Sequence, residues 1–169
     1  MAPKLRALLA SLLALGCLAG CGGGDAANVP LPTQQELGLD AKQSADYDPV
    51  TLDEVIRTLD RFDEAEDPGD VEQAREDFIG QHDRHWIGWV GVVTRTRIVS
   101  RDEIAVLVSA PGGSSGLIPT AINVLFEVPE DHPAHQLGRG DVVRFGGRLE
   151  FDGRSRQPWV LDARLPPRR

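Results

Sequence analysis

The sequence WIGWVGVVTRTRI, residues 86–98, decides the fold that we predict. It is long and rich in β-branched residues, a composition that favours a β-strand. Gly88 and Gly91 interrupt it, and glycine inside a strand indicates a bulge or sharp coiling. A long first strand that bends would allow a sheet of five strands to close on itself.

Four more strands are predicted downstream from the alternation of apolar and polar residues. They span residues 103–108, 120–128, 141–151 and 159–165. The last of them has one predominantly apolar set that alternates with a mixed set: Trp159, Leu161, Ala163 and Leu165 against Val160, Asp162 and Arg164. The two sets are expected on opposite faces of the strand.

Two segments resemble small bacterial OB-fold domains. They are WIGWVGVV at 86–93 and LGRGDVVRFGGRL at 137–149. The resemblance covers about residues 84–165 and implies a closed barrel in which the first strand neighbours the fourth. OB folds often carry a helix between the third and fourth strands, whereas residues 129–140 are predicted to form no more than a turn.

A helical hairpin is predicted ahead of the strands. Thr51 can cap a first helix, and Glu54 three residues later can complete a capping box. The apolar residues that follow share one helical face: Leu52, Val55, Ile56, Leu59 and Phe62. After a Pro68-Gly69 turn, a second helix is predicted from Asp70 to about Gly80. The predicted fold class is therefore α+β, with an N-terminal helical hairpin packed on a small five-stranded antiparallel OB-like β-barrel.

The N-terminus has the pattern of a secretory signal peptide. Basic Lys4 and Arg6 precede an apolar stretch at 7–20 that is too short to span a bilayer. Leu18-Ala19-Gly20-Cys21 resembles the bacterial lipobox, which implies cleavage before Cys21 and acylation of its thiol. Pairing or metal binding by Cys17 and Cys21 is the disfavoured alternative, since both lie in the apolar leader.

The lipobox resemblance predicts the location and the organisation of the chain. It implies a bilayer as partner and a place in the bacterial cell envelope, and Gly22 favours the outer membrane, facing the periplasm. The predicted parts are a signal peptide at 1–20, a flexible tether at 21–48, the helical hairpin at 49–81 and the barrel at 82–169.

Charge is uneven along the chain, whose net charge is −8. Residues 21–81 contain 16 acidic and 4 basic residues, whereas residues 82–169 contain 10 acidic and 12 basic residues. The acidic part is either a solvated face or a cover for basic positions on the second part.

The leading functional hypothesis is a non-catalytic, lipid-anchored module that binds an envelope protein or an anionic envelope component through its barrel face. No cofactor motif is found, so we expect none. The predicted binding residues are Arg95, Arg97, Arg144 and Arg148. They have the outward parity of the first and fourth strands, which would join them in one patch. Alternatively the acidic N-terminal segment occupies this patch as a structural seam.

Two other functions remain open. Single-stranded nucleic acid binding needs a basic groove with exposed aromatic rings, but Trp86 and Trp89 are expected inside the barrel and the chain is acidic. A zinc-dependent or other hydrolase would need the pairs His82/His85 and His132/His135 to meet in space; otherwise they are solvated loop residues. The motif GGSSG at 112–116 matches a serine-hydrolase pattern but lacks the helix that should follow.

Overall fold

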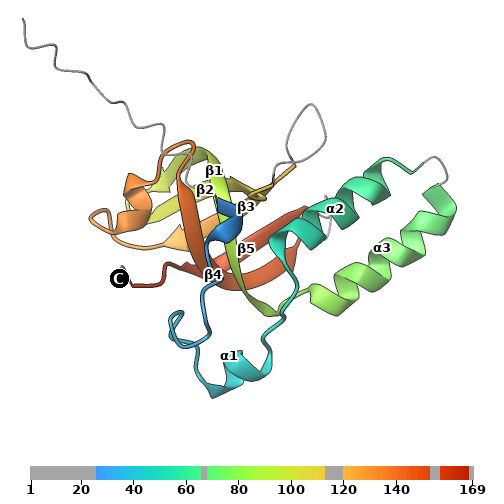
Figure 1. Ribbon diagram of the computed structural model, residues 1–169, viewed down its shortest axis with the longest axis horizontal. Helices are drawn as coiled ribbons and strands as arrows, with labels where there is room; N and C mark the ends of the chain where they lie inside the picture. Colours follow the sequence, from blue (N-terminus) through green and yellow to red (C-terminus); the bar gives the residue numbers. More distant parts are fainter. Residues whose placement is uncertain (1–25, 66–67, 113–119, 153–156, 168–169) are drawn as a thin grey trace, which may run out of the picture.

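The protein is a closed five-stranded barrel that helices α1 to α3 precede in the chain (Figure 1). The computed structural model describes residues 26–65, 68–112, 120–152 and 157–167. Around the barrel the strands follow the order β1-β2-β3-β5-β4, with β4 returning to β1. Their bounds are β1 Trp86–Ser100, β2 Glu103–Ser109, β3 Ala121–Glu127, β4 Val142–Phe151 and β5 Pro158–Arg164. The α+β fold class and the OB-like barrel are thereby confirmed.

The barrel is mixed, which corrects the prediction that it is antiparallel. Four of the strand pairs run antiparallel, but β3 and β5 run parallel, with Asn123 opposite Trp159 and Val124 opposite Val160. In a closed ring of five strands, neighbours cannot all be antiparallel, because the number of strands is odd. The four antiparallel pairs therefore leave β3 and β5 running in the same direction. Sequence alternation identifies strands but does not give the relative direction of strands that are distant in the chain.

The long, bent strand β1 pairs with β4 along its first half and with β2 along its second half. The pairing with β4 runs from Trp86 to Val92, and the pairing with β2 runs from Val92 to Ser100. The register between β1 and β2 shifts between Val93 and Arg95. Gly91 lies at the change of partner, and a Cβ there would overlap the side chain of Val108. The predicted role of glycine in coiling this strand is supported by that close approach.

The core fills the barrel, and one helix closes it. Trp89, Phe126 and Phe145 are fully buried, and the rings of Trp89 and Phe145 pack edge to face. Helix α2, Leu52–Asp63, adds its predicted apolar face to this core, with Leu52, Val55, Ile56 and Leu59 all buried. The indole of Trp89 donates a 2.7 Å hydrogen bond to the carbonyl of Val50, next to the helix cap Thr51.

The second helix of the hairpin is longer than predicted. Helix α3 runs from Pro68 to His82, so the expected Pro68-Gly69 turn forms part of its first turn. Proline suits that place because the first helical position needs no backbone N–H. Phe78 connects α3 to α2 and the barrel through edge-on ring contacts with Phe62 and Phe151. Figure 1 shows both helices projecting from one side of the barrel.

Residues 26–48 differ from the flexible tether that was predicted. They contain a 3₁₀ helix, η1 Ala26–Asn28, and a short helix, α1 Ala41–Ala45, that Asp40 caps. The stretch from residue 30 to residue 38, here called the strap, lies on the outer side of β1 and β4. Leu37 is only 3% exposed, so this segment is packed.

Two glycines of the barrel make room for this N-terminal segment. Gly88 and Gly146 are direct partners across β1 and β4. A Cβ on Gly146 would overlap Leu37, and a Cβ on Gly88 would lie 2.9 Å from the hydroxyl of Tyr47. This packing was not predictable from the sequence, because Leu37 is a single leucine and belongs to no periodic apolar pattern.

The connection before β4 contains one short helical turn, η2 Pro133–Gln136, whose Ala134 is fully buried. None of the helices in the described residues is long and apolar enough to cross a membrane.

Candidate binding groove on the barrel

A groove of about 440 Å³ lies on the outer face of the sheet, over the second half of β1 and over β2, β3 and β5. Its lining combines basic, apolar, amide and acidic side chains: Arg95, Thr96, Arg97, Val99, Glu103, Ala105, Leu107, Asn123, Leu125 and Trp159. This set is called the groove below.

Strand register arranges the groove in rows. Across the strands, Arg95 lies opposite Leu107, Leu107 opposite Asn123, and Asn123 opposite Trp159. Adjacent strands are about 4.8 Å apart, so Arg95 and Trp159 are three strand spacings apart, about 14 Å along the curved sheet. One step further along β1, Arg97 lies opposite Ala105, and Ala105 opposite Leu125. The rows place two arginines along one side of an apolar floor.

Arg95 and Arg97 are available for a ligand. Both side chains are exposed, and neither forms a salt bridge with any residue that the structure describes. An arginine fork donates two parallel hydrogen bonds to a carboxylate or a phosphate. These two guanidinium groups therefore suit anionic groups of a partner.

Trp159 is the aromatic residue of the groove, and it was not among the binding residues predicted from the sequence. Val160 is fully buried and points into the barrel, so Trp159 points outward and is partly exposed. The register between β4 and β5 shifts between Gly146 and Arg148, and Asp162 adopts a left-handed backbone with φ 52°. This irregularity returns Ala163 to the buried side. Alternation alone does not identify the outward face of β5, because apolar residues of both parities occur before the irregularity.

The four predicted arginines do not form one patch. Arg95 and Arg97 lie where β1 pairs with β2, whereas Arg144 and Arg148 lie opposite the half of β1 that pairs with β4. The bend in β1 thus separates the two pairs. Arg148 forms salt bridges with Glu150 at 2.9 Å and with Asp162 at 3.4 Å.

Arg144 belongs to the structural seam that the sequence analysis kept as an alternative. Its guanidinium forms a 2.9 Å salt bridge with Glu36 of the strap and donates to the carbonyls of Pro30 and Leu31 at 2.9 and 3.3 Å. Arg164 donates to the carbonyls of Leu37 and Gly38. Arg144 and Arg164 thus hold the strap, and their guanidinium groups are engaged in these contacts, whereas that of Arg95 forms no salt bridge with a described residue.

The histidine pairs are engaged separately. His82 is buried, with Nδ1 at 2.5 Å from Asp48 Oδ2 and its ring 4.6 Å from that of Phe78. His132 Nδ1 accepts from the backbone N–H of Ala134 at 3.2 Å, which caps η2.

The second histidine of each pair, His135 and His85, also has surroundings of its own. His135 Nε2 lies 3.2 Å from the carbonyl oxygen of Val128. His85 Nδ1 is buried and has no hydrogen-bond partner among the residues that the structure describes. Within the described ranges, no group of three or more histidine, cysteine, aspartate or glutamate side chains is placed to hold a metal ion.

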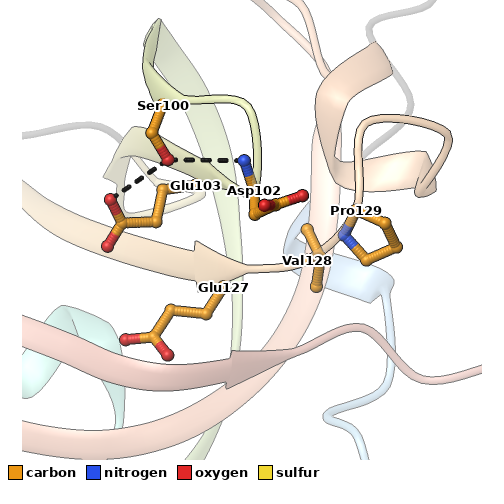
Figure 2. A pocket seen from close by; sticks show the side chains of 6 residues that line it. All are labelled: Ser100, Asp102, Glu103, Glu127, Val128 and Pro129. Carbon is orange, nitrogen blue, oxygen red and sulfur yellow. Dashed lines mark hydrogen bonds between the residues drawn. The ribbon is translucent and has the colours of Figure 1, made fainter.

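A second hollow of about 490 Å³ lies beyond the end of the groove (Figure 2). Its lining includes the carboxylates of Asp102, Glu103 and Glu127. Ser100 Oγ donates to Glu103 at 3.4 Å and accepts from the backbone N–H of Asp102 at 3.3 Å. Glu103 also lines the groove, so the two hollows are contiguous at that residue.

Two sequence hypotheses concern residues outside the described ranges. These are the lipidation of Cys21 and the serine motif at 112–116, of which the structure describes Gly112 alone.

The comparisons with known proteins show the fold. No protein-family model and no curated protein matches the sequence. The structure is similar to the crystal structure of a lipoprotein from Klebsiella pneumoniae subsp. pneumoniae that is provisionally described as nucleic acid-binding. The two share 12% identity with a TM-score of 0.51, over 76% of this chain and 99% of that chain.

Two further structures match a smaller share of this chain. A chain of the S. pombe Stn1-Ten1 complex is 18% identical with a TM-score of 0.34, over 49% of this chain and 59% of its own. An OBody bound to hen egg-white lysozyme is 22% identical with a TM-score of 0.36, over 51% of this chain and 83% of its own. These scores are too low to carry an argument.

Proposed function

We propose that this protein is a lipid-anchored binding module of the bacterial envelope that holds an anionic partner in the groove. One observation carries the proposal: Arg95 and Arg97, without salt bridges to described residues, line the same groove as the partly exposed Trp159. Arginine and tryptophan are the residues that contribute most to binding interfaces. The apolar floor at Leu107 and Leu125 adds contact area that a partner can bury.

The predicted anchor gives the module its place. Acylation of Cys21 with two or more chains would hold it stably in a bilayer. Ala26 is already buried against the folded part, and it is five residue steps from Cys21 along the chain. An extended chain of that length spans at most about 18 Å. The barrel would therefore work close to the membrane surface, where envelope proteins and anionic polymers are its partners.

A second candidate is the binding of single-stranded nucleic acid. Trp159 and Arg95 lie in one row of the groove. Sites for single-stranded nucleic acid combine an aromatic ring for base stacking with a cation for phosphate. The Klebsiella lipoprotein with a similar fold is provisionally described as nucleic acid-binding, which adds support for the fold but not for this chain's ligand. The net charge of −8 opposes this candidate.

Photocrosslinking in intact cells tests the proposal. A photoreactive residue at Leu125 would lie in the groove, and one at Arg57, exposed on α2, is the matched control. We expect a specific adduct from Leu125 and none from Arg57. The adduct should disappear in the Arg95→Glu variant and persist in Arg139→Glu, whose exposed arginine lies outside the groove. An adduct that is insensitive to Arg95→Glu would contradict binding through the groove.

A further inference from the structure

The groove ends in a pair of carboxylates. Glu103 and Glu127 are direct partners across β2 and β3, and Figure 2 shows both projecting to the same side. Like charges directly opposite each other destabilise a sheet. Within the described residues neither forms a salt bridge, and nearby Arg101 lies 3.7 Å from Glu130 instead. The pair therefore carries a repulsive cost that no salt bridge to a described residue offsets.

Charge changes sign along the strands of the groove. Arg95 and Arg97 occupy successive outward positions on β1, and the next outward pair beyond the row of Arg97 is Glu103 and Glu127. Outward positions two residues apart are separated by about 6.8 Å. The groove thus presents two positive steps followed by a negative step.

From this layout we infer that the occupant of the groove is an extended polypeptide segment of mixed charge. Its acidic side chains would contact Arg95 and Arg97, and a lysine or arginine would lie between Glu103 and Glu127. This rests on the proposed function and names the class of its partner.

The spacing of an extended peptide fits these steps. Its side chains on one face also recur at about 6.8 Å. Acidic residues at positions i and i+2 and a basic residue at i+4 therefore match the three rows of the groove in one direction or the other. The groove is lined by side chains of strands that are paired with each other, so recognition there comes from side chains.

A nucleic acid fits this layout less well, because every nucleotide brings a negative charge. The strand would have to place phosphates beside the Glu103 and Glu127 carboxylates, with repulsion instead of attraction. Two exposed apolar residues at the tip of β1 extend the surface for a protein partner: Ile98 is 70% exposed and Val99 is 49% exposed.

Binding of defined probes to the full-length protein in detergent micelles tests the inference. The probes are three labelled peptides that differ only in charge order and one oligothymidylate. The first peptide has Glu-x-Glu-x-Lys, the second has Glu-x-Lys-x-Glu, which fits in neither direction, and the third has three glutamates. We expect the first to bind about tenfold more tightly than the second and the third. In the Arg95→Glu variant the first peptide should lose this affinity, whereas Arg139→Glu should leave it unchanged.

The variant Glu103→Lys with Glu127→Lys supplies the converse test. It should prefer the peptide with three glutamates and should gain affinity for oligothymidylate. The milder Glu103→Gln with Glu127→Gln variant should melt no lower than the parent, since it removes a like-charge pair, and should lose the preference for the first peptide.

The outcomes separate the inference from the proposed function. Arg95-dependent binding of peptides regardless of charge order, or of oligothymidylate more tightly than any peptide, would overturn the mixed-charge partner and leave the groove as a binding site. Absence of Arg95-dependent binding by every probe would overturn the inference, while the cellular adduct at Leu125 would still decide the proposed function.

Discussion

At the scale of single residues, the two groups of arginines differ in what surrounds them, although the sequence gives them the same pattern. Arg144 has most of its side chain buried against Glu36 and two carbonyls, so it holds the strap. Arg95 is exposed and has no salt bridge with a described residue. The contrast predicts opposite consequences for stability and for binding.

Arg144→Ala should lower the free energy of unfolding by about 1–3 kcal/mol, because it removes a partly buried salt bridge to Glu36 and two hydrogen bonds to carbonyls. Arg95→Ala should change it by no more than about 0.5 kcal/mol. Chemical denaturation of both variants measures the difference. Equal losses from the two substitutions would mean that the strap is not held through Arg144.

Tyr47 gives the strap region a dependence on alkaline pH. Burial, with a smaller contribution from the charge of Asp48, raises the pKa of Tyr47 above its ordinary value of 10.0. The unfolded chain therefore loses the phenol proton first as the pH rises. This contribution to stability is complete below about pH 10 and is lost as the pH rises through the folded-state pKa.

Thermal melting from pH 8 to pH 11 should show a steeper loss of stability for the parent than for Tyr47→Phe, which has no ionisable group at this position. Parallel pH profiles of the two proteins would argue against a buried phenol.

At the scale of elements, strand existence was predictable. The β-branched composition of residues 86–98 and the period-two alternation downstream predicted five strands whose ends lie within two residues of the observed ones. What alternation could not give were features set by distant contacts. Three such features are the parallel pairing of β3 with β5, the outward position of Trp159 and the packing of Leu37 on Gly146. Each depends on residues that are far apart in the chain. The binding groove was half predicted for the same reason: Arg95 and Arg97 were found, and Trp159 was missed.

The helical hairpin was predicted from its caps and its apolar face, and α2 makes that face part of the barrel core. Leu59→Ala should therefore cost about 2–5 kcal/mol of unfolding free energy. Arg57→Ala, on the exposed side of the same helix, should cost less than about 0.5 kcal/mol. Thermal melts compare the two, and an unchanged midpoint for Leu59→Ala would mean that α2 is not part of the cooperative unit.

At the scale of the whole molecule, the strap lies in the chain between the predicted anchor and the barrel. The acidic N-terminal part was expected either to be solvated or to cover basic positions, and Glu36 on Arg144 realises the second arrangement at one site. Because the strap folds against β1 and β4, the barrel would be attached to the bilayer by a short segment instead of a long flexible one. Anchoring and folding should therefore be separable by substitution at Cys21.

Cys21→Ser should move the protein from the membrane fraction to the soluble fraction, because the serine hydroxyl does not provide the thiol that the lipobox resemblance requires for acylation. The melting temperature of the purified variant should equal that of the parent within about 1 °C, since the contacts of Leu37, Glu36 and Tyr47 with the barrel do not involve Cys21. Fractionation in high salt distinguishes acylation from charge-mediated adsorption, which salt weakens. Arg6→Ser, which leaves the lipobox intact, is the control for processing of the leader. A Cys21→Ser protein that still sediments with membranes in high salt would contradict anchoring by this cysteine.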